Sequence, residues 1–464
     1  MGRAYRLGFF TFAMVTASII ISLRSLPVQA MTGMNILFYF FITTIGFLLP
    51  ITLILKLFGT AYPVEGGLYA WVKEAFGERW GFSAIFIQWM HLIIVSVLLL
   101  SFISSAIAYI FLPELSENKL YILIVSLIFF WGATIISMRG LKTSTRFSTI
   151  CVIIGVFVPA VLIIGMAGFH LISGSRSAID LSFTIGTIIP DLASLSALAM
   201  VAAFVNPFFG IEASAGHLGD LKNPKRNYLP TILIAGLFCV LVNTLCSLSI
   251  AVVIPREEIS FAAGLLQALS FLFDQIAAGW LLTIVILLIM AGTLGEINSW
   301  ILAPARGMTE TARNGSLPRY MQYSNENGIP SHTLIVQAVA VSVFCIIFAL
   351  IPGVNDAYWV LLSLLTHIYL VAYLILILSA IKLRKKLFSV NGYHSVLVKG
   401  IFWIISGIGI VTILGIELIT FLSPDGNGTP LNPMYITGMA LLMMVIISIP
   451  LITYAIRKPG WKSD

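Results

Sequence analysis

The sequence predicts an all-α integral membrane protein, and three observations lead to this fold class. Hydrophobic residues make up 59% of the 464 residues and charged residues only 10%, whereas soluble domains are about a quarter charged. Apolar runs of about 20 residues, the length that crosses a bilayer, recur along the chain. These runs lack the alternation of apolar and polar residues that is typical of a transmembrane β-barrel.

Twelve such runs are expected to form transmembrane helices, numbered here as spans 1 to 12. Only short polar segments separate them, so the chain is expected to fold as one bundle, a single transmembrane domain. The predicted spans cover about residues 7–29, 34–57, 81–112, 120–138, 147–172, 190–216, 228–253, 277–303, 332–352, 356–381, 398–422 and 434–456.

The basic residues predict the orientation of this bundle. When loops are assigned alternately to the two sides, the side with both termini carries 22 basic residues, and the other side carries only Lys119, Arg176 and Arg256. Cytoplasmic loops are enriched in lysine and arginine, so we expect a multi-pass protein of the cell (inner) membrane with both termini in the cytoplasm. The basic loops would lie at the inner leaflet of the lipid bilayer, which explains the net charge of +7 without a nucleic-acid partner.

The segment between spans 2 and 3 is expected to be a helix lying at the cytoplasmic face. Its sequence is PVEGGLYAWVKEAF, residues 63–76. Gly66 and Gly67 would let it approach the bundle closely, and Trp71 would anchor it at the membrane interface.

The chain shows no pattern for a cofactor, a metal ion or catalysis. Its four cysteines, Cys151, Cys239, Cys246 and Cys345, lie far apart in apolar spans, which indicates buried thiols and neither disulfide nor metal spacing. No phosphate-binding loop, dinucleotide-binding motif or nucleophile motif occurs. We therefore expect no cofactor, no metal and no enzymatic activity.

Spans 1 and 6 carry residues that interrupt a membrane helix. Span 6 contains FVNPFFGIEASAGH, residues 204–217, with Pro207, Gly210 and a carboxylate at Glu212. Span 1 contains TASIIISLRSLP, residues 16–27, with Arg24 in mid-span. Interruptions at corresponding places in two halves of a chain point to the substrate site of an inverted-repeat transporter.

Two adjacent breaks would suit an amino acid as ligand. An unwound turn exposes backbone N–H groups that attract a carboxylate, and its free carbonyls can accept bonds from an ammonium group. The alternative is that these prolines and glycines only kink their helices.

Three segments resemble the amino acid–polyamine–organocation (APC) transporters. They are PVEGGLYAWVKEAFGERWGF (63–82), GIEASAGHLGDLKNPKRNYLP (210–230) and GEINSWILAPARGM (295–308). Together they look most like the bacterial glutamate/γ-aminobutyrate (GABA) antiporter branch, and the resemblance extends from span 1 to span 12.

This resemblance implies a LeuT-like fold, a five-plus-five inverted repeat with broken helices 1 and 6. Repeat one would cover about residues 7–172, repeat two about 190–383, and two peripheral helices about 398–456. Transport would proceed by alternating access around a central site. Carried over position by position, the implied substrate-binding residues are Ser18, Ile21, Ser22, His91, Asn206, Phe209, Gly210 and Trp300, with Phe208 as a further aromatic cover.

Three ionisable residues within the spans leave alternatives open. Arg24 replaces the tyrosine-rich sequence of the antiporter branch; it could select an anionic substrate side chain, pair with a carboxylate, or reach the outer surface. Glu212 could support the two halves by bonding N–H groups freed in span 1, contact substrate, or carry a proton. Glu296, one turn before Trp300, could pair with a hydroxyl or with an amide such as Asn298, or it could serve substrate or proton coupling.

The function expected from these observations is secondary active transport of an amino acid, most favourably as an antiporter with glutamate/GABA-like exchange. A proton-coupled amino acid symporter is the first alternative. A non-transporting receptor, or a subunit that depends on a partner chain, is the second. The expected partners are the amino acid substrate and the lipid bilayer, and assembly as a homodimer is left open.

Overall fold

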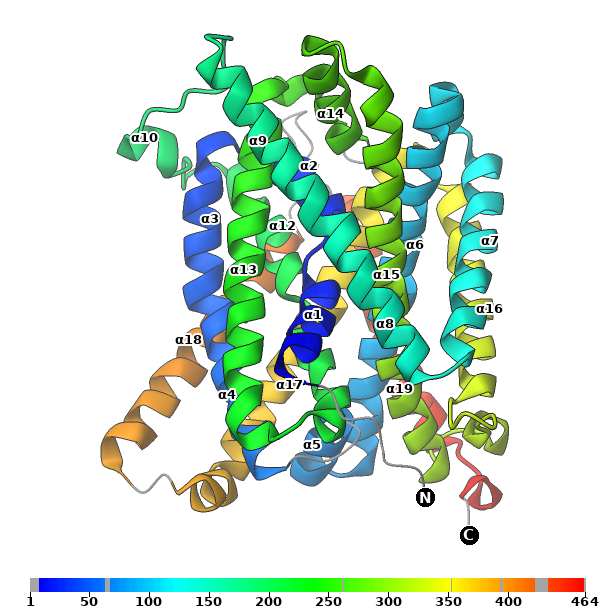
Figure 1. Ribbon diagram of the computed structural model, residues 1–464. Helices are drawn as coiled ribbons and strands as arrows, with labels where there is room; N and C mark the ends of the chain where they lie inside the picture. The colour runs from blue at the N-terminus through cyan, green and yellow to red at the C-terminus, as the bar shows by residue number, and fades with distance from the viewer. Residues whose placement is uncertain are drawn as a thin grey trace.

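The computed structural model describes residues 8–62, 67–260, 263–351, 353–392, 395–421 and 433–462. Every long regular element in these ranges is a helix, and the helices form one bundle (Figure 1). Twelve helical segments of the described residues are long and apolar enough to cross a membrane, which confirms the predicted number of spans.

Several spans consist of two helices in succession. The elements are α1 Phe9–Ile20 and α2 Leu26–Ala30 in span 1, α3 Ile36–Thr43 and α4 Leu49–Ala61 in span 2, α6 Glu78–Phe111, α7 Lys119–Met138, α8 Leu141–Val152 and α9 Val158–Ile172 in span 5, α11 Leu195–Ala199 and α12 Val201–Val205 in span 6, α13 Pro224–Val253, α15 Gly279–Arg313, α16 Ser331–Leu350, α17 Val354–Asn391, α18 Val396–Thr420 and α19 Pro433–Ala455.

Two helices extend well beyond their predicted spans. α15 ends at Arg313 instead of near 303, and α17 ends at Asn391 instead of near 381. The added segments are polar, with sequences PARGMTETAR and KLRKKLFSVN. Hydropathy marks where a helix leaves the apolar layer, but lysine, arginine and glutamate are good helix formers, so the backbone hydrogen bonding continues beyond that point.

Three short helices lie outside the spans. α10 (Ile185–Ile188) and α14 (Gly264–Gln275) lie at one end of the bundle, and α5 (Gly67–Phe76) lies at the other, called the α5 face below (Figure 1). α5 confirms the predicted helix between spans 2 and 3, although Pro63–Gly66 lie outside the described residues. Trp71 is buried and stacks on Phe58 with ring centroids 4.9 Å apart, so its predicted role as an interface anchor is wrong.

A polar cluster holds α5 to two spans. Lys73 Nζ lies 2.7 Å from Glu78 Oε2, and the Tyr69 hydroxyl donates to Glu78 Oε1 at 2.6 Å. Asn314, just after α15, donates to the same Tyr69 oxygen at 2.9 Å. Burial and the Glu78 carboxylate raise the pKa of Tyr69 above its ordinary value, so Tyr69 stays a neutral hydrogen-bonding group at physiological pH.

The spans that contain the breaks are central and the last two are peripheral. In the most apolar window of α6, 83% of the residues are buried, whereas the corresponding value for α19 is 17%. The window of span 1 is 72% buried even though it holds Arg24. The peripheral position of spans 11 and 12 was predicted and is confirmed.

Spans 5 and 8 touch through glycine backbones. A Cβ placed on Gly155 would lie 2.2 Å from the backbone nitrogen of Gly292, and one on Gly295 would lie 2.4 Å from Cys151 Cβ. Close backbone approach of this kind is a recurrent way for membrane helices to gain packing energy. It fixes α15, and the side chains that α15 carries, against span 5.

The Gly155 contact gives a first prediction. Gly155→Ala forces the two backbones apart, and overpacking of this kind costs about 1–3 kcal/mol; we expect the unfolding temperature in detergent to fall by several degrees. Gly165→Ala is the matched control, because Gly165 lies in the same span with nothing within 4 Å of its added Cβ. An equal effect of the two substitutions would contradict the proposed role of the contact.

Candidate functional site

The first break lies at Ile21 and Ser22. α1 ends at Ile20, and both following residues have extended backbone, with φ and ψ of −98° and 106° at Ile21 and −123° and 118° at Ser22. The break deprives the last carbonyls of α1 of helical partners. Side chains take their place, because Trp300 Nε1 donates to Ile19 O at 3.3 Å and the Cys239 thiol donates to Ile20 O at 3.2 Å.

The second break lies at Phe209 and Gly210. Phe209 is extended, and Gly210 has φ +97°, a left-handed conformation that favours glycine. A Cβ on Gly210 would lie 2.3 Å from the Trp300 ring and 2.5 Å from Ile19. Glycine is therefore required here twice, by its backbone angle and by the close approach of Trp300.

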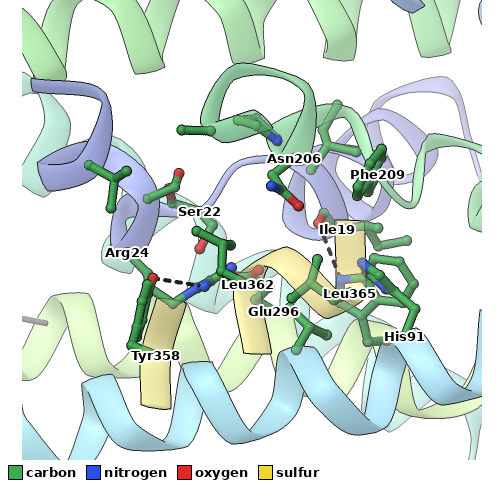
Figure 2. A pocket seen from close by; sticks show the side chains of 17 residues that line it. Ile19, Ser22, Arg24, His91, Asn206, Phe209, Glu296, Tyr358, Leu362 and Leu365 are labelled. Carbon is green, nitrogen blue, oxygen red and sulfur yellow. Dashed lines mark hydrogen bonds between the residues drawn. The ribbon is translucent and has the colours of Figure 1, made fainter. Parts of the chain in front are cut away.

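A narrow cavity of about 30 Å³ lies between the two breaks. It is small for an amino acid, so binding must displace some of the side chains around it. Figure 2 shows its lining, which comes from both breaks and from α6, α15 and α17. The lining residues are Ile19, Ile20, Ser22, Arg24, Ser25, Val28, His91, Val95, Ala203, Asn206, Pro207, Phe209, Glu296, Trp300, Tyr358, Leu362 and Leu365.

One basic and one acidic side chain face this cavity. Arg24 is 6% exposed and its Nη1 donates to the Tyr358 hydroxyl at 2.9 Å, the bond drawn in Figure 2. Glu296, on α15, is 5% exposed. No ion pair joins these two described side chains, and Arg24 Nε has no hydrogen-bond partner among the described residues. A basic and an acidic side chain that form no ion pair with each other can each take a polar or charged group of a ligand.

Aromatic rings form one wall of the cavity. His91 stacks on Tyr369 with centroids 3.9 Å apart and an interplanar angle of 18°. The His91 ring also lies 4.9 Å from Trp300 and 5.9 Å from Phe209. On the same side as the second break, Asn206 Nδ2 donates to Thr366 of α17 at 2.9 Å.

Glu212 lies behind the second break and does not line the cavity. Its carboxylate accepts hydrogen bonds from the hydroxyls of Tyr369 and Tyr373, both on α17, and from Gln88 Nε2 of α6 at 2.8 Å. The Tyr373 oxygen also accepts the N–H of Gly210 at 3.2 Å. Glu212 therefore supports the break, but through α6 and α17 instead of the span 1 N–H groups expected from the sequence.

The structure brings together seven of the twelve residues predicted for the site. Ser22, Arg24, His91, Asn206, Phe209, Glu296 and Trp300 line the cavity. The other five lie outside it. Phe208 packs toward span 2, with its ring centroid 6.5 Å from that of Phe47. Ser18 forms a hydrogen bond with Ser299 at 2.7 Å. Glu212 lies behind the second break, and Ile21 and Gly210 are part of the breaks themselves.

Sequence reasoning missed the contribution of α17. Tyr358, Tyr369 and Tyr373 all serve the site, and Leu362 and Leu365 line it. The spacing of these residues, i, i+4, i+7, i+11 and i+15, places them on one face of a helix. That period was available in the sequence and could have identified the face.

The described residues contain no group of three or more His, Cys, Asp or Glu side chains that could hold a metal ion. The site is thus built from two helix breaks, aromatic rings, one basic side chain and one acidic side chain. Residues 7–448 match the amino acid permease family. The chain belongs to this family. Its membership confirms the resemblance drawn from the three sequence segments.

The relatives of this amino acid permease include transporters of several kinds. It is 33% identical over 420 residues to an uncharacterised transporter of Legionella pneumophila, with 90% of each chain covered. It is 28% identical over 460 residues to a glutamate/γ-aminobutyrate antiporter of Lactococcus lactis, covering 97% of this chain and 91% of that one. At 24% identity over 378 residues it also resembles a probable agmatine/putrescine antiporter of Lactococcus lactis.

A solved structure shows the same fold. The permease aligns with MhsT in complex with L-phenylalanine at a TM-score of 0.63 and 16% identity, over 95% of this chain and all of that chain. This likeness confirms the predicted fold class, a twelve-helix LeuT-like membrane protein. The limits of the two repeats, about 7–172 and 190–383, stay a prediction.

The Tyr373 hydroxyl gives a second prediction. Tyr373→Phe leaves the Gly210 N–H without its acceptor and the Glu212 carboxylate without one donor, and unpaired buried polar groups cost about 1–3 kcal/mol. We expect the KM for substrate to rise roughly tenfold, measured by uptake into proteoliposomes. Tyr369→Phe is the comparison, because Gln88 still donates to the same carboxylate oxygen.

The two tyrosine variants need a stability measurement beside the uptake assay. Tyr369→Phe should raise KM less than Tyr373→Phe does, and the unfolding temperatures show whether both variants are folded at the temperature of the uptake assay. If both variants change KM equally, the bond to Gly210 has no special part in shaping the site.

Proposed function

We propose that this permease is an amino acid antiporter that exchanges glutamate for GABA or for a related pair of substrates. The observation that carries the proposal is the placement of Arg24 and Glu296 on one cavity between the two breaks. Glutamate and GABA share two charged groups, an ammonium and a distal carboxylate, and differ by the α-carboxylate. A site that binds the shared groups can accept both molecules in turn.

The cationic side of the cavity suits the distal carboxylate. Arg24 is held by Tyr358 through one nitrogen only, which leaves the other guanidinium N–H groups for a ligand, since arginine has five donors. Guanidinium and carboxylate form paired, charge-assisted hydrogen bonds. A buried arginine is also held in place before binding, so the bond requires little further ordering.

The anionic side suits the ammonium group. Glu296 faces the cavity from α15 (Figure 2). The carbonyls of Ile19 and Ile20 each accept one side-chain donor, and a carbonyl oxygen can accept a second. The α-carboxylate of glutamate, which GABA lacks, would then lie against the N–H groups that follow the first break.

Transport would follow an alternating-access cycle. Trp300, Phe209 and His91 close the occupied site, and the bundle then tilts so that the site opens to the other side. GABA brings one positive and one negative group, so the cavity that holds it is nearly neutral when it reorients, whereas glutamate adds the negative charge of its α-carboxylate. Reorientation of an empty cavity would leave the ligand-binding donors of the buried Arg24 without a partner, which favours exchange over one-way movement. The distribution of basic residues supports an orientation in which the α5 face lies on the cytoplasmic side of the inner membrane.

Proton-coupled symport is the second candidate, because two buried carboxylates, Glu212 and Glu296, lie at the breaks. Counterflow in proteoliposomes separates the two functions. Exchange requires internal glutamate or GABA for uptake of labelled substrate, whereas symport gives uptake into empty vesicles under a pH gradient alone. A purified chain that moves no substrate under either condition would instead be a receptor or a partner-dependent subunit.

Replacement of Arg24 gives a third prediction. Arg24→Gln removes the charge that binds the distal carboxylate, and hydrogen bonds to charged groups contribute about 1.5–3 kcal/mol. We expect the preference for glutamate over alanine, measured as the ratio of their kcat/KM values in counterflow, to fall about 10- to 100-fold.

Tyr358→Phe is the matched control for this prediction. It removes the hydrogen-bond partner of Arg24 but keeps the cation, so the preference for glutamate should fall less than tenfold. A preference that stays unchanged in Arg24→Gln would show that Arg24 does not select the substrate.

A further inference from the structure

A second hollow lies on the lipid-facing surface near the α5 face, between α4, α17 and α18. Its volume is about 240 Å³, and all but one of its lining residues are apolar. Leu53 and Leu57 of α4, Phe388 of α17 and Ile401 and Ile405 of α18 contribute most of its walls, and the exception is Lys56. The hollow is called the α18 groove below.

The groove results from how α18 is fixed. In mid-helix α18 packs closely, because a Cβ on Gly409 would lie 2.9 Å from Ile377 and 3.2 Å from Pro50. Toward its start, Phe402 meets Phe388 edge to face at 5.1 Å. These large rings hold α18 away from α4, and Figure 1 shows the two helices diverging toward the α5 face.

The end of the groove at the α5 face is basic. Asn391 of α17 donates to Leu57 O at 3.3 Å, which brings the polar end of α17 to the end of α4. Between residues 382 and 399 the chain has five basic residues, and between 357 and 416 it has no aspartate or glutamate. Lys386 pairs with Glu74, and the Arg384 guanidinium lies 5.5 Å from the ring centroid of Trp403. Lys399 is exposed, next to the lining residue Val398.

We propose that the α18 groove binds an anionic phospholipid from the leaflet at the α5 face. An acyl chain fills the apolar groove, and the phosphate lies between Lys56 and the basic end of the groove, with Lys399 beside it. Basic pockets between membrane helices select anionic headgroups in this way. The inference rests on the membrane fold and not on the proposed exchange.

A second copy of the chain fits this surface poorly. In a twofold dimer the same patch meets itself, so the basic rims of two α18 grooves would face each other. The chain has no acidic residue between 357 and 416 to balance them, and Glu74 of α5 is already paired with Lys386. A phospholipid supplies both the apolar chain and the negative charge.

Native mass spectrometry of the full chain, extracted in a mild detergent with equal amounts of phosphatidylglycerol and phosphatidylcholine, tests the proposal. The wild-type protein should retain phosphatidylglycerol in preference. Lys56→Gln combined with Lys399→Gln should lower that retention about five-fold for each lysine removed. Ile405→Trp, which fills the groove and keeps its charges, should lower it as well.

Lys458→Gln is the control, since Lys458 is an exposed basic residue after α19, outside the groove. Unfolding temperatures in the same detergent show whether each variant is folded. The proposal is overturned if the wild type retains both lipids equally, if Lys458→Gln lowers retention as much as the double variant, or if Ile405→Trp retains phosphatidylglycerol fully. A lipid-free dimer that Ile405→Trp dissociates would also overturn it, because the groove would then hold a second copy.

Discussion

The packing of Trp300 against Gly210 is the contact on which the site depends. The indole ring occupies the space that any side chain at Gly210 would need, and its Nε1 bonds the last turn of α1 at Ile19. One residue of α15 therefore joins both breaks. Because Gly210 also has a left-handed backbone, no other residue type satisfies both the angle and the contact. The cavity, its charges and its aromatic wall are arranged around this junction.

Much of the architecture could be predicted from the sequence because it follows from local composition. The twelve spans follow from hydropathy, and the breaks follow from Pro207, Gly210 and the polar run around Arg24. The ends of α15 and α17 were not predicted, because hydropathy reports the apolar layer and not the helix. Trp71 was misplaced for a related reason, since a tryptophan in an amphipathic helix can face either the interface or the bundle.

The site itself was predicted in part. Residues at the breaks, together with His91, Glu296 and Trp300, were identified, and Arg24 was recognised as a departure from related sequences. The hydrogen-bond partners of Glu212 were not predicted. Gln88, Tyr369 and Tyr373 lie more than a hundred residues from it along the chain, and only tertiary packing brings them together. Phe208 ends a short 3₁₀ turn and Phe209 is the extended residue that follows it, and only Phe209 reaches the cavity.

The continuity of α15 links the cavity to the α5 face in a mechanical sense. From the Gly155–Gly292 contact to Arg313 the helix runs about 30 Å at 1.5 Å per residue. A tilt of about ten degrees about that glycine contact would move its far end by about 5 Å. There Asn314 bonds Tyr69, and through it α5 and Glu78. A small rearrangement around Trp300 that tilts α15 about the Gly155–Gly292 contact would then move Asn314 far enough to break or re-form its hydrogen bond to Tyr69.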